Sequence, residues 1–245
     1  MEFLTVAPPF ETDDVFPWRF NRRLSYMRRP LLIRRDESGA DSLVWGIRHT
    51  YEAGIYLFGM CWEGRLRASS TQLRQWMGHR RNRAGAEFNA SVTEVIRLDR
   101  ALTVRANVRR FGDRQIARDS GEPLGDVDVL VADPRSRTLV AIEAKNLTGA
   151  GLPHQIANEL SETFQSRGRR PASVQIHAER VEWLRKNLPD VLEAIDLASH
   201  DASTWKVRGL VVVDREVLSA FLTECPFPVV PLWTVASANS LMALL

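Results

Sequence analysis

Two apolar runs separated by a short turn constrain the fold of this chain more than any other feature. Residues 125–131 are Gly-Asp-Val-Asp-Val-Leu-Val, and residues 139–145 are Leu-Val-Ala-Ile-Glu-Ala-Lys. The Asp-Pro-Arg-Ser segment between them, residues 133–136, is typical of a turn. Apolar residues occupy both faces of the second run, which indicates a buried strand. The pattern therefore predicts a β-hairpin inside a larger sheet.

The predicted hairpin brings acidic side chains together. Side chains alternate between the two faces of a strand, so Asp126 and Asp128 share a face, as do Glu143 and Lys145. A turn centred near residues 135–136 places Asp128 opposite Glu143 to within a residue or two, at a separation of about 5 Å. Two carboxylates this close repel unless a cation lies between them, and Mg²⁺ prefers oxygen ligands. We therefore expect Mg²⁺ between Asp128 and Glu143, with the Lys145 ammonium one pleat away.

A simpler alternative gives the same residues a structural role. Asp126, Asp128, Glu143 and Lys145 would then form a cross-strand ladder of salt bridges on a solvated face. The apolar residues on both faces of residues 138–145 argue against a solvated face, because charges at the end of a buried strand are costly unless they are paired or bind a metal.

The hairpin resembles the catalytic hairpin of the PD-(D/E)XK, or restriction-endonuclease-like, nucleases. Asp128 matches the first acid of that motif, Glu143-Ala144-Lys145 matches its acid-x-lysine element, and residues 125–128 match the glycine, acid, apolar residue and aspartate that precede it in many members. Within this superfamily the chain looks most like the nuclease-related domains of bacteria. The resemblance covers residues 85–213 in the order of elements, although only the hairpin is distinctive.

The resemblance implies a role for each hairpin residue. Asp128, Glu143 and the carbonyl oxygen of Ala144 would hold Mg²⁺, for which Mn²⁺ can substitute, and Asp126 would assist a second ion or steer water. Lys145 would orient the attacking water or help to deprotonate it. The helix before the first core strand often supplies a further acid in this superfamily, and Glu87 is the best-placed candidate here. A first-turn glutamate that interacts with the helix dipole is the alternative for Glu87.

Four polar residues outside the hairpin are candidates for contact with nucleic acid. Residues 102–111 alternate between apolar and polar side chains, and the polar face includes Arg105, Asn107 and Arg109, which could meet a phosphate backbone. Gln175 lies near the start of a predicted helix, where related nucleases often place polar residues that contact substrate. A role on the helix surface is the alternative for Gln175.

The order of the predicted elements indicates an α/β fold. Residues 69–98 form two helices or one kinked helix, residues 156–164 and 174–188 are helical, and residues 240–245 form a terminal helical fragment. Strands are predicted at residues 102–111, in the hairpin, and at residues 207–213 and 229–235. This order fits a restriction-endonuclease-like core with a mixed central sheet flanked by helices, placed at residues 69–245.

Residues 1–68 form a separate N-terminal accessory segment in this prediction. An irregular arm over residues 1–30 precedes a hairpin at residues 31–35 and 42–46 and a short apolar helix at residues 51–62, which we expect to be buried. The segment is either an accessory region or the tail of a longer polypeptide. Arginines interleaved with aromatic residues in this segment suit phosphate and base contacts, unless they are simply solvated surface residues.

Composition excludes several classes of protein. Two cysteines, Cys61 and Cys225, cannot build a disulfide framework, and the start of the chain lacks a secretory signal, so we expect a cytoplasmic protein. The longest apolar run is too short to span a bilayer, so no membrane partner is expected. The net charge of +3 permits a polyanionic partner.

These features lead to one hypothesis and its competitors. The chain is expected to be a Mg²⁺-dependent endonuclease that hydrolyses phosphodiester bonds of nucleic acid, with DNA favoured over RNA, in bacterial defence or repair. The competing hypothesis is a catalytically inactive nuclease-fold module that binds DNA or a protein partner through its arginines and the N-terminal segment.

Overall fold

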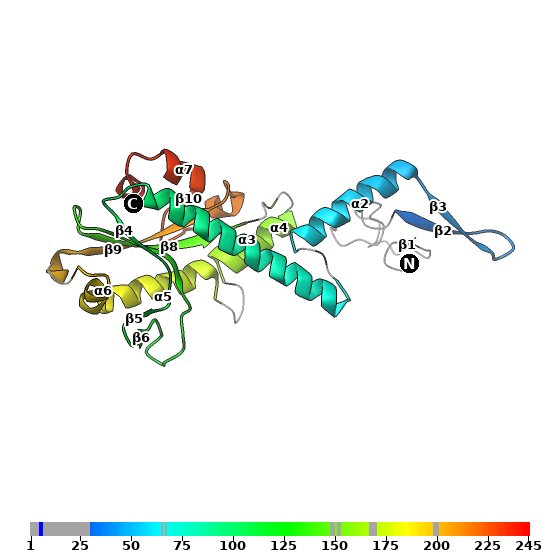
Figure 1. Ribbon diagram of the computed structural model, residues 1–245. Helices are drawn as coiled ribbons and strands as arrows, with labels where there is room; N and C mark the ends of the chain where they lie inside the picture. The colour runs from blue at the N-terminus through cyan, green and yellow to red at the C-terminus, as the bar shows by residue number, and fades with distance from the viewer. Residues whose placement is uncertain are drawn as a thin grey trace. The chain divides into compact units, whose positions relative to one another are not determined.

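The computed structural model describes residues 5–6, 30–64, 66, 68–147, 150, 153–166, 171–197 and 201–245, and its chain divides into two compact units (Figure 1). Unit 1 is Met1–Asn82 and unit 2 is Arg83–Leu245. The division falls inside one continuous helix, so the expected domain boundary after residue 68 stays a prediction. Apart from residues 5–6 and 30, the predicted arm of residues 1–30 lies outside the described residues.

Unit 1 contains a small sheet and a helix. Strands β2 (Leu31–Arg35) and β3 (Asp41–Trp45) pair antiparallel, as predicted, and β1 (Thr5–Val6) pairs parallel to β2. Helix α2 (Ile47–Trp62) follows and begins four residues before the predicted start. The prediction that this helix is buried is wrong, because Ala53 is its one buried residue among those described. Apolar side chains surround the helix, so a single packed face cannot cover them.

The sequence predicted either two helices or one kinked helix in this region. The structure has one continuous helix, α3 (Thr71–Arg97). Gly78 and Gly85 lie inside it without ending it. A glycine inside a helix costs only about 1 kcal/mol relative to alanine, which the packing of the second half of α3 can offset.

Unit 2 is built around a mixed five-stranded sheet in the order β10-β9-β8-β7-β4. The strands are β4 (Thr103–Val108), β7 (Val127–Asp133), β8 (Thr138–Lys145), β9 (Lys206–Val213) and β10 (Val229–Pro231). Strands β4, β7 and β8 pair antiparallel, whereas β8, β9 and β10 pair parallel. The predicted α/β class with a mixed central sheet flanked by helices is confirmed, and a restriction-endonuclease-like core stays a prediction.

Helices cover both faces of this sheet (Figure 1). Phe88 and Val92 of α3 pack with Val129, Val140 and Ile142 on one face. Helix α5 (Ser173–Lys186) covers the other face. Its Val181 and Leu184 pack with Leu130 of β7 and with Leu139 and Ala141 of β8. The alternation of strand side chains therefore assigns the odd-numbered residues from Leu139 to Lys145 to the α5 face.

The predicted strand at residues 102–111 is interrupted. Strand β4 ends at Val108, and a separate two-stranded hairpin follows, formed by β5 (Arg110–Phe111) and β6 (Arg114–Gln115). Asn107 adopts a positive φ of 54°, which asparagine tolerates better than most residues. This left-handed residue breaks the regular ladder with β7 near the end of β4.

The helices after the predicted hairpin are more divided than the sequence indicates. Helix α4 (Pro153–Glu159) continues into a π-helical turn, η1 (Leu160–Phe164). Helix α5 ends at Lys186, and α6 (Leu188–Ala194) follows with a proline in its first turn. Proline fits the first turn of a helix but not its interior, so a new helix starts here.

The C-terminal region corrects one further prediction. Only residues 229–231 of the predicted strand are extended, and α7 (Leu232–Ser237) takes up the rest. A short apolar run fits a buried strand or a buried helix equally well, so periodicity could not separate them. The remaining short 3₁₀ turns are η2 (Ala202–Thr204), η3 (Leu218–Phe221) and η4 (Leu241–Leu244). None of the helices within the described ranges is both long and apolar enough to cross a bilayer.

Candidate functional site

The register of β7 and β8 brings the predicted acids to the same place. Val129 pairs with Ile142 and Asp133 pairs with Thr138, which confirms the predicted hairpin and its turn. Extended by one residue, this register sets Asp128 opposite Glu143. The backbone N–H of Ala144 donates a hydrogen bond of 2.8 Å to Asp128 Oδ2, which fixes one carboxylate oxygen against the neighbouring strand.

Glu143 is almost completely buried and binds two cations. Its side chain is 4% exposed, Lys145 Nζ lies 2.7 Å from its Oε1, and Arg180 Nη1 lies 2.6 Å from its Oε2. Burial alone would raise the pKa of Glu143, but Lys145 and Arg180 outweigh burial and hold this pKa below its ordinary value. Glu143 is therefore ionised at neutral pH.

Arg180 is the main site residue that the sequence did not reveal. It projects from α5, and its Nε donates a hydrogen bond of 2.8 Å to the carbonyl oxygen of Leu124. Gly125 has a φ of +82°, and a Cβ atom there would lie 3.1 Å from Arg180 Nη2. The absence of a side chain at Gly125 therefore leaves room for the Arg180 guanidinium. The sequence held one signal, because Arg180 precedes Val181 and lies one turn before Leu184 on the helix predicted to pack on the sheet.

His177 lies beside Glu143 but does not neutralise it. Its Nε2 is 3.2 Å from the carbonyl oxygen of Ala141, and its Nδ1 is 3.8 Å from Glu143 Oε2. Burial lowers the pKa of His177 to about 4, although the charge of Glu143 acts in the opposite direction. The imidazole is thus neutral at pH 7, Nε2 carries the proton that the Ala141 carbonyl accepts, and the contact with Glu143 is not an ion pair.

Asp128 is the acid that the neighbouring cations leave uncompensated. Burial, followed by the negative charge of Glu143, raises its pKa to about 7. The Ala144 N–H and the charge of Lys145 oppose this rise without cancelling it. A carboxyl group in this state can bind a cation, or can take up and release a proton near neutral pH.

The described residues contain no ready-made metal cluster, since no three histidine, cysteine, aspartate or glutamate side chains among them converge. A metal at this site would use Asp128 and Glu143, and its other ligands would come from backbone carbonyls, water or substrate. Such a set fits Mg²⁺, which usually keeps several waters and takes only one or two protein carboxylates.

Glu87 lies on α3, which covers the sheet face opposite to α5. Its Oε1 accepts a hydrogen bond of 2.7 Å from Arg83 Nε, and its side chain is mostly exposed. No interaction links it to Asp128 or Glu143 among the described side chains, so the catalytic role expected from the resemblance stays a prediction.

The two arginines predicted to contact nucleic acid each lie near an acid of the same chain. Arg105 Nη2 is 3.4 Å from Asp196 Oδ2, and Arg109 Nη2 is 3.7 Å from Asp126 Oδ2. Both arginine side chains are substantially exposed, so these pairs are weak and can be exchanged for a phosphate at little cost.

The two predicted amide contacts also have partners within the chain. Asn107 Oδ1 accepts a hydrogen bond of 2.9 Å from Asn89 Nδ2, which joins β4 to α3. Gln175 Oε1 accepts from the backbone N–H of Ala172 at 3.3 Å and so closes the N-terminus of α5. These contacts give both residues structural roles, and their contact with nucleic acid stays a prediction.

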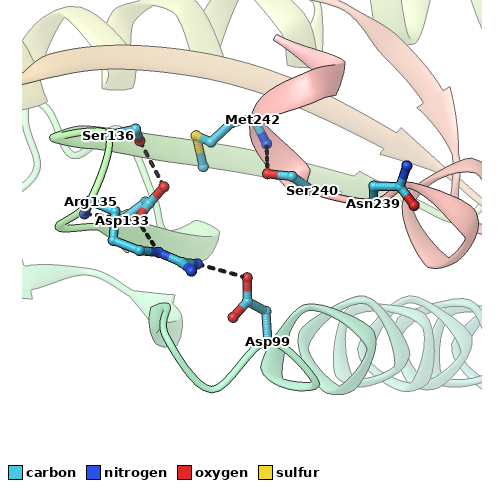
Figure 2. A pocket seen from close by; sticks show the side chains of 7 residues that line it. All are labelled: Asp99, Asp133, Arg135, Ser136, Asn239, Ser240 and Met242. Atoms are coloured by element: carbon cyan, nitrogen blue, oxygen red, sulfur yellow. Dashed lines mark hydrogen bonds and ion pairs between the residues drawn. The ribbon is translucent and has the colours of Figure 1, made fainter.

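A cavity of about 440 Å³ lies at the other end of the β7–β8 hairpin (Figure 2). Arg135 lies between two acids in Figure 2, 3.2 Å from Asp99 Oδ2 and 3.5 Å from Asp133 Oδ1. The charges that line this cavity are therefore satisfied by one another, and none of the predicted catalytic residues lines it.

Comparison with known proteins identifies the family. The model of the family described as "Anti-phage protein Upx-like" matches residues 3–214 of the 245 residues. The chain belongs to the Upx-like family of anti-phage proteins. No curated protein and no solved structure matches it. Of the two expected settings, defence and repair, the Upx-like family supports bacterial defence, and the relation to PD-(D/E)XK nucleases stays a prediction.

Proposed function

We propose that this Upx-like protein is a Mg²⁺-dependent deoxyribonuclease that defends bacteria by hydrolysing phosphodiester bonds. The observation that carries the proposal is the pairing of Asp128 with Glu143 on adjacent strands, with Lys145 2.7 Å from Glu143. The raised pKa of Asp128 adds support, because it marks a carboxyl group that the charge of Lys145 does not fully compensate.

The proposal assigns a separate role to each residue of the site. Asp128 and Glu143 would hold Mg²⁺, which supplies charge stabilisation for the phosphate during hydrolysis. Arg180 keeps Glu143 ionised and in position, and the Ala144 N–H orients Asp128. Lys145 would orient the attacking water or help to deprotonate it. Arg105 on the edge strand β4 and Arg109 just after it would contact the phosphate backbone.

Cleavage of plasmid and single-stranded DNA, with Mg²⁺ or with EDTA, tests the proposal. Lys145→Ala should lower the cleavage rate by about a hundredfold to ten-thousandfold, the range for loss of a proton-transfer group. Lys186→Ala, at a lysine whose side chain is 58% exposed, is the matched control and should keep full activity. Full activity in folded Lys145→Ala protein, or equal activity in EDTA, would refute the assignment.

A second candidate function follows from the same ion pairs. Lys145 and Arg180 already satisfy both oxygens of Glu143, and this arrangement also suits a nuclease-fold module that binds DNA or a protein partner without catalysis. In that case purified protein would retard DNA in a gel without cutting it under any metal condition. Lys145→Ala would then reduce stability while leaving DNA retardation intact.

A further inference from the structure

Helix α2 carries an exposed apolar stripe that nothing in the proposed nuclease uses. Its members are Ile47, Tyr51, Ile55, Phe58 and Trp62, which are 86%, 67%, 54%, 66% and 49% exposed. Their spacings of four, four, three and four residues place them on one face of the helix. Soluble proteins rarely expose a continuous apolar surface of this length unless it binds something.

Four of the five members are symmetric about the point midway between residues 54 and 55, and Ile55 is the exception. In an antiparallel pair of α2 helices, Ile47 of one copy lies opposite Trp62 of the other, and Tyr51 lies opposite Phe58. The fifth member, Ile55, lies opposite Gly54 of the second copy, where the missing side chain leaves room for it.

The glycines of α2 support close packing of two helices. A Cβ atom at Gly54 or at Gly59 would meet no atom of the described residues within 4 Å, so no neighbour among them explains either glycine. Each costs a helix interior about 1 kcal/mol relative to alanine. Gly54 is next to Ile55, and Gly59 is next to Phe58. At each position the missing side chain lets the backbone of a second helix approach.

The stripe also has the size of a specific interface. Five large apolar side chains, about two thirds exposed, offer roughly 130 Å² each. Two copies would therefore bury about 1,300 Å², which is within the range of stable protein interfaces. One end of the stripe is also held in place, because Trp62 stacks on Phe58 with ring centroids 5.9 Å apart and Arg80 lies 3.7 Å over the Trp62 ring.

We propose that α2 is a self-association surface through which two copies of the chain pair in antiparallel register. A second copy fits this face better than a lipid surface does. Helices that lie in a membrane interface carry several lysines or arginines on their polar face, whereas α2 has one arginine, Arg48. The pairing is independent of the proposed nuclease activity, because it involves none of the residues on β7, β8 or α5.

Sedimentation of the full-length chain across a wide range of protein concentration tests the proposal. We expect wild-type protein to sediment at twice the monomer mass. Tyr51→Lys and Phe58→Glu should each weaken the dimer by about a hundredfold, because each places one charge against an apolar residue. Leu98→Glu, at an apolar residue that is 81% exposed outside α2, should leave the dimer unchanged.

The double variant Tyr51→Lys/Phe58→Glu tests the register. In the antiparallel pair each lysine faces a glutamate, so the dimer should return to within about tenfold of wild-type affinity. In a parallel pair like charges would face each other and the protein would stay monomeric, which would overturn the proposed register. A wild-type protein that is monomeric at every concentration would overturn the proposal, including when it then binds neutral phosphatidylcholine vesicles.

Discussion

Each end of the β7–β8 hairpin carries an aspartate, and the pKa values of the two aspartates shift in opposite directions. At the turn, the Arg135 N–H donates to Asp133 Oδ1 at 3.0 Å and the Ser136 hydroxyl donates to Oδ2 at 2.8 Å. These bonds, and the charge of Arg135, outweigh burial and lower the pKa of Asp133. At the open end, Asp128 receives one backbone N–H, and its pKa rises to about 7.

The difference lies in where the donors come from. Asp133 finds its partners within three residues, because a turn brings its own N–H and hydroxyl groups back to the aspartate. The acids at the open end depend on α5, which supplies Arg180 from 37 residues beyond Glu143. An acid whose stabilisation is incomplete lowers the stability of the fold, and such groups concentrate at functional sites.

The largest effect should come from removing the long-range cation. Arg180→Ala leaves Glu143 buried with Lys145 as its one remaining cation among the described side chains, and breaking a buried ion pair typically costs about 3–5 kcal/mol. Denaturant unfolding measures this loss. Arg185→Ala, on the same helix, removes a half-exposed ion pair with Glu182 and one hydrogen bond to the carbonyl oxygen of Val207, and should cost about 1 kcal/mol. Equal losses in the two variants would contradict the role assigned to Arg180.

Replacing the uncompensated acid should stabilise the protein at high pH. Because the pKa of Asp128 is raised from 3.8 to about 7, the folded state holds an extra proton between these values, so stability falls as pH rises from 3.8 to about 7 and is level above it. Asp128→Asn removes this penalty, up to a ceiling of about 4 kcal/mol, and keeps an acceptor for the Ala144 N–H.

The signature of this effect is its dependence on pH. Unfolding curves of wild type and Asp128→Asn should nearly coincide at pH 4, separate as pH rises toward 7 and differ by a constant amount above it, with the variant more stable. Asp119→Asn, at a side chain that is 97% exposed, should follow wild type throughout. If Asp128→Asn were less stable than wild type at pH 8, Asp128 would be a stabilising group and the comparison of the two ends would fail.

Added Mg²⁺ should act at the open end of the hairpin. A ligand at ten times its dissociation constant stabilises a folded protein by about 1.4 kcal/mol. Because Mg²⁺ competes with a proton on Asp128, the rise in melting temperature should be larger at pH 8 than at pH 6. Thermal unfolding with and without Mg²⁺ measures it. An equal rise in Asp128→Asn protein would place the metal elsewhere.

The same contrast explains how far the sequence could predict the structure. The hairpin, its turn and the pairing of Asp128 with Glu143 follow from alternation and turn residues, which are local. The contacts of Arg180 and His177 with β8 depend on how α5 is rotated on the sheet, and the periodicity of the helix alone does not specify this. The exposed stripe of α2 was likewise expected to be buried, because an apolar run does not show what covers it.

The smallest effect should come from the turn end of the hairpin, where the substitution matched to Asp128→Asn should have the opposite sign. Asp133→Asn replaces one carboxylate oxygen with an amide and weakens the bonds from Arg135 and Ser136, so it should cost about 1 kcal/mol at pH 7. The pKa of Asp133 is lower in the folded state than in the unfolded state. The stabilisation by its carboxylate is therefore present above the unfolded pKa of Asp133 and is lost as pH falls through its folded pKa. The free energies of unfolding of wild type and Asp133→Asn, measured by chemical denaturation, should therefore differ at pH 7 and converge as pH falls through the folded pKa of Asp133. A variant as stable as wild type at pH 7 would show that the turn does not depend on its carboxylate, and the two ends of the hairpin would then differ only in their distance from α5.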